Sequence, residues 1–219
     1  MINLFNVDCM EYMKTIPDKH YDLAIVDPPY GLGMSQKFHQ NGENNSPCCW
    51  KKYSSKQWDS MTPDQNYFDE LFRISRNQII WGGNYFIDKI IRPSQCWLIW
   101  NKGQRGFSLA DGEMAWTSFD RAVRIFDYSR ATALNENRKN GGMFHPTKKP
   151  VALYIWILEN YASKGDKIFD SHLGSGSIGI ACHDMGFDLD ACEIDIDYFQ
   201  LAKERIENHQ QQIQLFGAL

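Results

Sequence analysis

The chain has 219 residues and a net charge of −4, and 43% of its residues are hydrophobic. This length predicts one large domain with enough apolar residues to fill a core. No apolar run approaches the roughly twenty residues of a membrane helix, and the amino terminus lacks a signal-peptide pattern, so we expect a cytoplasmic protein without membrane contact. Its six cysteines are scattered and form no Cys-x-x-Cys pair, which favours free thiols and predicts no metal site.

Short apolar runs that alternate with helical patterns predict a doubly wound α/β sheet. We expect strands at residues 2–5, 22–26, 78–81, 96–101, 167–170 and 188–194. We expect helices at residues 62–75, 151–161 and 197–211. In the first of these helices, Thr62 would be the cap and Pro63 the first helical residue. Two late strands, around Ala115 and over 123–128, predict an antiparallel edge.

The residues Asp27, Pro28, Pro29 and Tyr30 directly follow the apolar run 23–26. Open α/β sheets bind ligands at the carboxyl ends of their strands, so these four residues form a candidate site. Proline fixes φ and has no backbone donor, so the loop is stiff and leaves carbonyl acceptors. A carboxylate, carbonyls and an aromatic ring suit a planar ligand with an exocyclic amine. The alternative is a proline turn in which Tyr30 simply packs on the core.

A second candidate site begins at the end of the strand 167–170. Asp170 is followed by the turn Ser171, His172, Leu173, Gly174, Ser175 and Gly176, and then by a helix of small residues. The glycines allow the backbone to approach a ligand, and the amino terminus of a helix adds favourable dipoles. Glu193 lies near the end of the next strand, about where an acid binds ribose hydroxyls in such folds. The alternative is a tight β-to-α turn that binds nothing.

Together, these motifs resemble the S-adenosylmethionine-dependent DNA adenine-N6 methyltransferases of the permuted β order, in which the catalytic motif precedes the cofactor motif. The segments 8–13, 80–86, 113–118 and 145–150 are also similar to this family. The resemblance extends over residues 4–206 and is weakest at 32–61 and 119–144. It implies a Rossmann-like, mostly parallel sheet with an antiparallel edge.

The resemblance also implies roles for the site residues. Asp27 and the Pro28 carbonyl are expected to bind the amine of a flipped-out adenine, and Tyr30 to stack on the base, with Pro29 completing the catalytic motif. S-adenosylmethionine is the implied cofactor, and no metal is required. The residues expected to bind this cofactor are Asp8, Cys9, Asp27, Lys148, Asp170, His172, Gly174, Ser175, Gly176 and Glu193. The family often has Pro-Phe at positions 171 and 172, so His172 would replace an aromatic ring.

Basic residues concentrate outside the cofactor half, in spite of the negative net charge. Those expected to contact DNA are Lys51, Lys52, Arg105, Arg121, Arg124, Arg130, Arg138 and Lys139. We expect them to converge on one face, and the alternative is that each cluster is merely solvated. Residues 32–61 are polar and aperiodic and predict a flexible loop that faces DNA. Residues 119–144, rich in Arg and Asn, are the candidate target-recognition segment.

The predicted function is therefore site-specific methylation of adenine N6 in DNA. Methylation of the exocyclic amine of cytosine, or of an RNA base, is the alternative within the enzymes. An alternative of another class is a non-catalytic protein that binds S-adenosylmethionine and DNA, although the intact Asp27 and Tyr30 argue against it. The chain has no nuclease motif, which leaves a separate restriction endonuclease as a partner, and the short recognition segment leaves a homodimer open.

Overall fold

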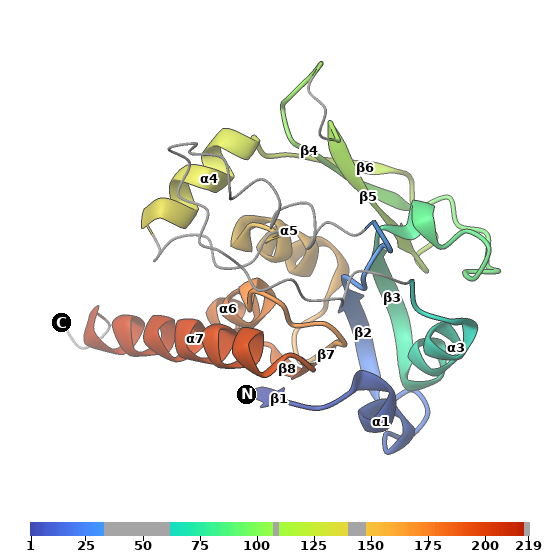
Figure 1. The fold of residues 1–219 in the computed structure, drawn as a ribbon, viewed down its shortest axis with the longest axis horizontal. Coiled ribbons are helices and arrows are strands. Elements are labelled where there is room, and N and C mark those ends of the chain that lie inside the picture. Colours follow the sequence, from blue (N-terminus) through green and yellow to red (C-terminus); the bar gives the residue numbers. More distant parts are fainter. Residues whose placement is uncertain (33–61, 107–109, 140–147, 217–219) are drawn as a thin grey trace.

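The computed structural model describes residues 1–32, 62–106, 110–139 and 148–216, with the backbone alone at 134, 136–139 and 213–216 (Figure 1). The described part contains one sheet of eight strands in the order β1-β8-β7-β2-β3-β5-β4-β6. The strands are β1 (Ile2–Phe5), β2 (Tyr21–Val26), β3 (Ser75–Trp81), β4 (Trp97–Asn101), β5 (Gly112–Thr117), β6 (Arg124–Asp127), β7 (Lys167–Asp170) and β8 (Asp188–Cys192). All the strands predicted from the sequence are therefore present.

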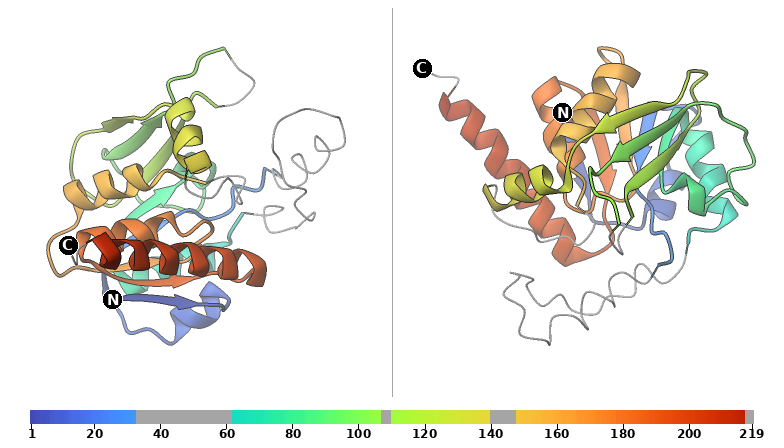
Figure 2. Two further views of the ribbon diagram at one scale, coloured as in Figure 1. Left: turned by 90° about the vertical axis from the view of Figure 1, so that its left-hand side faces the viewer. Right: turned by 90° about the horizontal axis from the view of Figure 1, so that it is seen from above.

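Helices cover both faces of this sheet (Figures 1 and 2). The helices are α1 (Cys9–Lys14), α3 (Gln65–Ile74), α4 (Arg130–Lys139), α5 (Val151–Tyr161), α6 (Ser177–Met185) and α7 (Ile196–Phe216), with a 3₁₀ turn η1 (Gly83–Tyr85). Helices α1 and α3 lie on one face, and α5, α6 and α7 lie on the other. None of the helices in the described ranges is long and apolar enough to cross a membrane.

The sheet is mostly parallel, as predicted, and β5 is the strand that runs against its neighbours. The position of this strand differs from the prediction, because β5 lies between β3 and β4 and not at the edge. The edge strand β6, predicted as antiparallel, pairs parallel with β4. After β4 the chain turns back into β5, which pairs antiparallel with β4. It then passes to the other side of β4 and forms β6, which again runs parallel to β4.

Alternate residues of the strands feed two hydrophobic cores. Leu23 and Ile25 of β2 belong to the core beneath α5, α6 and α7. Ala24 and Val26 belong to the core beneath α1 and α3. Since side chains alternate across a strand, an apolar run without alternation is what a sheet buried on both faces requires.

Helix α3 begins later than predicted. Its cap is Asp64, whose side chain accepts a hydrogen bond from the backbone N–H of Tyr67 at 3.1 Å. Thr62 and Pro63 precede the helix, so the prediction that Thr62 is the cap is wrong. A carboxylate three residues before a free N–H satisfies it directly, and this explains why the helix starts after Asp64.

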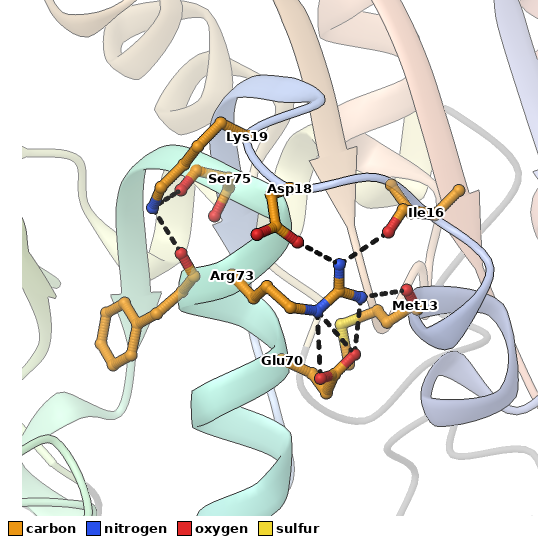
Figure 3. Close-up of polar contacts among 8 residues, drawn as sticks. Met13, Ile16, Asp18, Lys19, Glu70, Arg73 and Ser75 are labelled. Atoms are coloured by element: carbon orange, nitrogen blue, oxygen red, sulfur yellow. Dashed lines mark hydrogen bonds and ion pairs between the residues drawn. The ribbon is translucent and has the colours of Figure 1, made fainter.

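Arg73, near the end of α3, ties this helix to the loop after α1 (Figure 3). Its guanidinium donates to the backbone carbonyls of Met13 at 2.8 Å and Ile16 at 2.7 Å. The carboxylates of Glu70 and Asp18 neutralise it, at 2.7 Å and 2.8 Å. Arg73 therefore adds charged donors to a carbonyl in the last turn of α1, which also accepts from the Ile16 N–H at 3.0 Å, and to a carbonyl in the loop after it.

Arg73→Met is expected to lower the free energy of unfolding by about 2 kcal/mol or more, because two carbonyls and two carboxylates lose a charged donor together. Urea unfolding of the purified protein measures this loss. Arg76→Met is the matched control, since Arg76 lies on β3, has a side chain that is 60% exposed and forms an ion pair with Asp22 at 3.4 Å. Equal stability of the two variants would contradict this role for Arg73.

Candidate active site

The two candidate motifs meet at one point of the sheet. Strands β2 and β7 are neighbours, with Leu23 opposite Ile168 and Ala24 opposite Phe169. The chain continues from β7 to β8 on one side and from β2 to β3 on the other, so this pair is the topological switch point. Ligands of open α/β sheets bind in the crevice at that point. The sheet thus brings Asp27, after β2, close to Asp170, at the end of β7.

Asp27 and Tyr30 form a hydrogen-bonded pair. The Tyr30 hydroxyl donates to Oδ1 of Asp27 at 2.6 Å. Burial raises the pKa of both groups, and the negative charge of Asp27 raises the pKa of Tyr30 further. Tyr30 is therefore a neutral hydroxyl at ordinary pH. It donates its proton in a hydrogen bond to Asp27, which the sequence predicts to be catalytic.

The ring of Tyr30 fits where it does because residue 82 has no side chain. Gly82 has φ +71°, and a Cβ there would lie 2.2 Å from Cε1 of Tyr30. On the ring itself, Tyr85 stacks at a centroid distance of 5.1 Å and an interplanar angle of 17°. The segment after β3 therefore shapes the seat of this ring, which explains Gly82 and Tyr85, whereas Gly83 leaves room for Trp116, whose Cβ would lie 2.6 Å from an added side chain.

Lys149 is the first of two residues at this site that the sequence did not predict. Its side chain is 2% exposed, and its ammonium group contacts Oδ2 of Asp27 as well as the Tyr30 hydroxyl at 3.2 Å. Oε2 of Glu113, the second missed residue, lies 3.1 Å from the same ammonium. Lys102 contacts the other oxygen of Glu113. The site therefore contains a chain of alternating charges that runs from Lys102 to Asp27.

A signal for these two residues existed in the sequence. Glu113 is the second residue of β5, and an antiparallel strand brings its first residues to the edge where its neighbours end. The predicted late antiparallel strand would have placed an acid there. Lys149 lies beside Lys148 immediately before Pro150 and α5, and both lysines are buried. The sequence predicts Lys148 as a cofactor ligand, whereas the residue that contacts the Asp27 carboxylate is Lys149.

Glu193 holds the glycine-rich turn in place. Its Oε2 accepts a hydrogen bond from the Gly174 N–H at 2.9 Å, and its Oε1 accepts one from the Asp195 N–H at 3.0 Å. On the other side, Arg205 of α7 donates to the Ser175 carbonyl at 2.7 Å. Gly176 has φ +73° and is the cap of α6, so a residue without a side chain is needed there. This turn is fixed at both ends by long-range contacts.

Asp170 is buried, and two other acidic residues act on its carboxyl group. Burial raises its pKa to about 8, the charges of Asp27 and Glu193 raise it too, and the His172 N–H that donates to it at 3.0 Å opposes the shift. Burial also lowers the pKa of His172 to about 4, so its imidazole is neutral. The His172 ring packs edge-on to the Tyr67 ring at a centroid distance of 5.6 Å, as an aromatic side chain would. Its Nδ1 also forms a hydrogen bond with the Ser171 hydroxyl at 2.8 Å.

The opening segment also reaches this edge of the sheet. Asp8 follows β1 and caps α1, accepting a hydrogen bond from the Met10 N–H at 2.7 Å. Because β1 pairs parallel with β8, Asp8 and Cys9 lie on the same edge as Glu193. Burial raises the pKa of the Cys9 thiol to about 12, so this thiol is not a nucleophile. All the residues expected to bind a cofactor thus lie at one edge.

The four predicted basic residues whose side chains the structure describes do not lie on one edge of the sheet, contrary to expectation. Arg105 and Arg130 follow β4 and β6 and lie at the edge of the candidate site. Arg124 is the first residue of β6 and Arg121 lies shortly before it, so both are at the opposite edge, where Arg121 donates to the Asn160 carbonyl at 2.6 Å. Lys51 and Lys52, and the side chains of Arg138 and Lys139, lie outside the described residues. So does most of the predicted loop 32–61, while the predicted recognition segment supplies β6 and α4.

Comparison with known proteins places this geometry in a family. The type II methyltransferase M.HpaI of Haemophilus parainfluenzae is 24% identical over 92% of this chain and 73% of its own length. M.HinfI of Haemophilus influenzae is 25% identical over 91% of this chain and 66% of its own length. The crystal structure of an M1.HpyAVI–SAM complex has the same fold, with a TM-score of 0.60, 20% identity, and coverage of 94% of this chain and 100% of that one.

The family model described as DNA methylase, named for N6 and N4 methyltransferases, matches residues 92–204. This range contains Glu113, Lys149, Asp170 and Glu193, and it therefore includes the glycine-rich turn and, apart from Asp27, the chain of charges described above. The chain belongs to the DNA methylase family.

Proposed function

We propose that the chain transfers a methyl group from S-adenosylmethionine to N6 of a flipped-out adenine in a specific DNA sequence. The observation that carries this proposal is the placement of Asp27 and Tyr30 at the switch point of the sheet, beside the buried carboxyl group of Asp170. An acceptor, a stacking ring and a cofactor turn then lie within one crevice. Geometry of this kind suits attack by an amine on a bound methyl donor.

The side chains of the crevice fit the charges of S-adenosylmethionine. The charges of Asp27 and Glu193 both raise the pKa of Asp170, and the side chains of Asp170 and Glu193 are buried. Such a set of carboxyl groups favours a ligand that carries positive charge, and this cofactor carries a sulfonium and an ammonium group. When bound, it supplies a methyl group that is already activated. We assign Asp170, Gly174, Ser175, Gly176 and His172 to its methionine side.

The residues that we assign to the remaining cofactor contacts lie at the same edge of the sheet. We assign Glu193 to the ribose, since it directly follows β8, about where an acid binds ribose hydroxyls in such folds. Asp8 and Cys9 are assigned to the adenine ring, and Lys148 to the carboxylate of the methionine part. These assignments rest on position at the edge and on the resemblance of the motifs.

We assign the binding and activation of the target base to the catalytic motif, residues 27–30. A base inside a duplex is out of reach of a crevice, so it must leave the stack. The lone pair of an exocyclic amine is delocalised into the ring, and hydrogen bonds from this amine to Asp27 and to the Pro28 carbonyl localise it. Tyr30 holds the base by stacking. After attack, the amine becomes acidic and its proton passes to Asp27 or to a water beside it. Pro29 keeps the loop rigid.

Adenine is proposed over cytosine because the first motif residue is Asp27, whereas enzymes that act on the exocyclic amine of cytosine more often have Ser there. Methyl transfer from labelled S-adenosylmethionine to unmethylated genomic DNA tests the proposal, with the modified nucleoside identified by mass spectrometry. N6-methyladenine in a fixed sequence context is the expected product. N4-methylcytosine would move the substrate, and cofactor binding without transfer to DNA or RNA would favour the non-catalytic alternative.

We propose further that this methylation protects cytoplasmic DNA against a separate restriction endonuclease. The relatives M.HpaI and M.HinfI, named type II methyltransferases, support that role. DNA methylated by the chain should resist one such nuclease and remain sensitive to others. We also propose a homodimer on DNA, because the recognition segment is short. Analytical ultracentrifugation with a duplex that contains the target measures the stoichiometry, and a one-to-one complex would exclude it.

A further inference from the structure

Both catalytic side chains of the motif are fastened to one buried cation. The ammonium group of Lys149 has three donors, and the structure gives it three acceptors: Oδ2 of Asp27, the Tyr30 hydroxyl and Oε2 of Glu113. The same ammonium lies 5.3 Å from the centroid of the Trp81 ring. With every donor used and 2% of the side chain exposed, Lys149 has one orientation available.

We propose that Lys149 and Glu113 are positioning residues: Glu113 holds the Lys149 ammonium group, and Lys149 orients Asp27 and keeps it ionised as the acceptor for the target amine, an inference that rests on the proposed methyl transfer. Tyr30 binds one oxygen of Asp27 and Lys149 binds the other, which fixes the carboxylate plane. Each oxygen retains a lone pair, so the amine can still bind. Lys149 itself is no general base, because Asp27 and Glu113 hold its proton.

The charges of the cluster act on Asp27 with opposite signs. Burial raises the pKa of Asp27, Lys149 lowers it, and Glu113 raises it. The titratable groups that face Asp27 come from every element around it: Tyr30, Glu113, Lys149, Tyr67 of α3, Tyr154 of α5 and Asp170. Lys149 is the cation among them in the described part of the chain. Lys102, on the far side of Glu113, completes a cluster of two positive and two negative charges.

Two substitutions separate this electrostatic role from a merely structural one. Lys149→Met removes the cation, so the acid limb of the pH profile of kcat/KM should move to higher pH, with a loss of about 100-fold at pH 7. Glu113→Gln removes the anion and leaves Lys149 on Asp27, so the limb should move to lower pH. A structural role would reduce the rate at every pH, or would move the limb in the same direction in both variants.

The experiment records the pH profile together with a ¹³C NMR titration of the Asp27 carboxyl group in the wild type and in both variants. Opposite shifts in the two variants support the inference, and unshifted or parallel titrations overturn it. The NMR titration needs no turnover, so opposite shifts without any methyl transfer would retain the inference about Asp27 and reject the proposed function. Lys203→Met is the control, since Lys203 is on α7 and half exposed, and thermal unfolding identifies a variant that fails to fold.

Discussion

Asp27→Asn is expected to reduce kcat for methyl transfer by about 1000-fold while S-adenosylmethionine still binds. The substitution keeps the shape of the side chain and removes the charge that accepts the amine hydrogen. Tyr30 can still donate to the remaining carbonyl oxygen, so the ring should stay in place. Single-turnover methylation of a duplex with its target, beside calorimetric titration of the cofactor, separates chemistry from binding.

Asp120→Asn is the matched control for this variant, because Asp120 is exposed and follows β5 at the opposite edge of the sheet. This control should retain full activity. If Asp27→Asn were to transfer methyl groups at the rate of the control, the acceptor role of Asp27 would be wrong. A joint loss of cofactor binding and activity would instead assign Asp27 to the cofactor alone.

Asp170→Asn is expected to stabilise the free protein at pH 7 and to abolish tight cofactor binding. Burial raises the pKa of Asp170 to about 8, whereas an exposed aspartate titrates near 3.8. Between these values the folded state keeps a proton that the unfolded state has lost, so the free energy of unfolding falls as the pH rises. Asparagine has no such proton and can still accept the His172 N–H. Functional sites often retain residues that cost stability in this way.

The measurement is the melting temperature from pH 5 to pH 8.5 for the wild type, Asp170→Asn and the control Asp120→Asn. The wild type and the control should lose stability towards pH 8, and Asp170→Asn should show a flatter curve that lies above them at pH 7 and 8. A melting temperature for Asp170→Asn below that of the wild type at pH 8 would refute the assignment of a raised pKa.

The same shift predicts a proton linked to cofactor binding. A positively charged ligand favours the ionised form of Asp170, so binding below pH 8 should release a proton and affinity should increase as the pH rises towards 8. Calorimetry of S-adenosylmethionine in two buffers of different ionisation enthalpy counts that proton. Binding that is independent of both pH and buffer would show that Asp170 does not titrate with the ligand.

The sequence predicts those parts of the site that depend on one strand and the residues after it. Asp27 and Asp170 each follow an apolar run, and a parallel sheet places the ends of such runs at one edge. The same reasoning predicted the helix 151–161 with its observed bounds, because Pro150 lies directly before it. In each case a local pattern determines the structure.

The missed parts depend on contacts between distant segments. Arg73 and Arg205 end on carbonyls of other elements, and nothing in the residues next to them indicates this. Adjacent lysines look equivalent in the sequence, but only the packing decides that Lys149 contacts Asp27. Glu113 was missed because its role depends on contacts with Lys149 and Lys102, which lie in other segments of the chain.

The pairing of the first and last strands has a consequence for synthesis of the protein. β2 lies against β7 and β1 against β8, so the crevice is made by residues that are separated by most of the chain. Non-local parallel pairing forms late in folding, because long loops must close before the contacts stabilise the sheet. On a translating ribosome the catalytic motif emerges long before the strands that complete its crevice. A growing chain therefore has no methyltransferase site until β8 has been released from the exit tunnel.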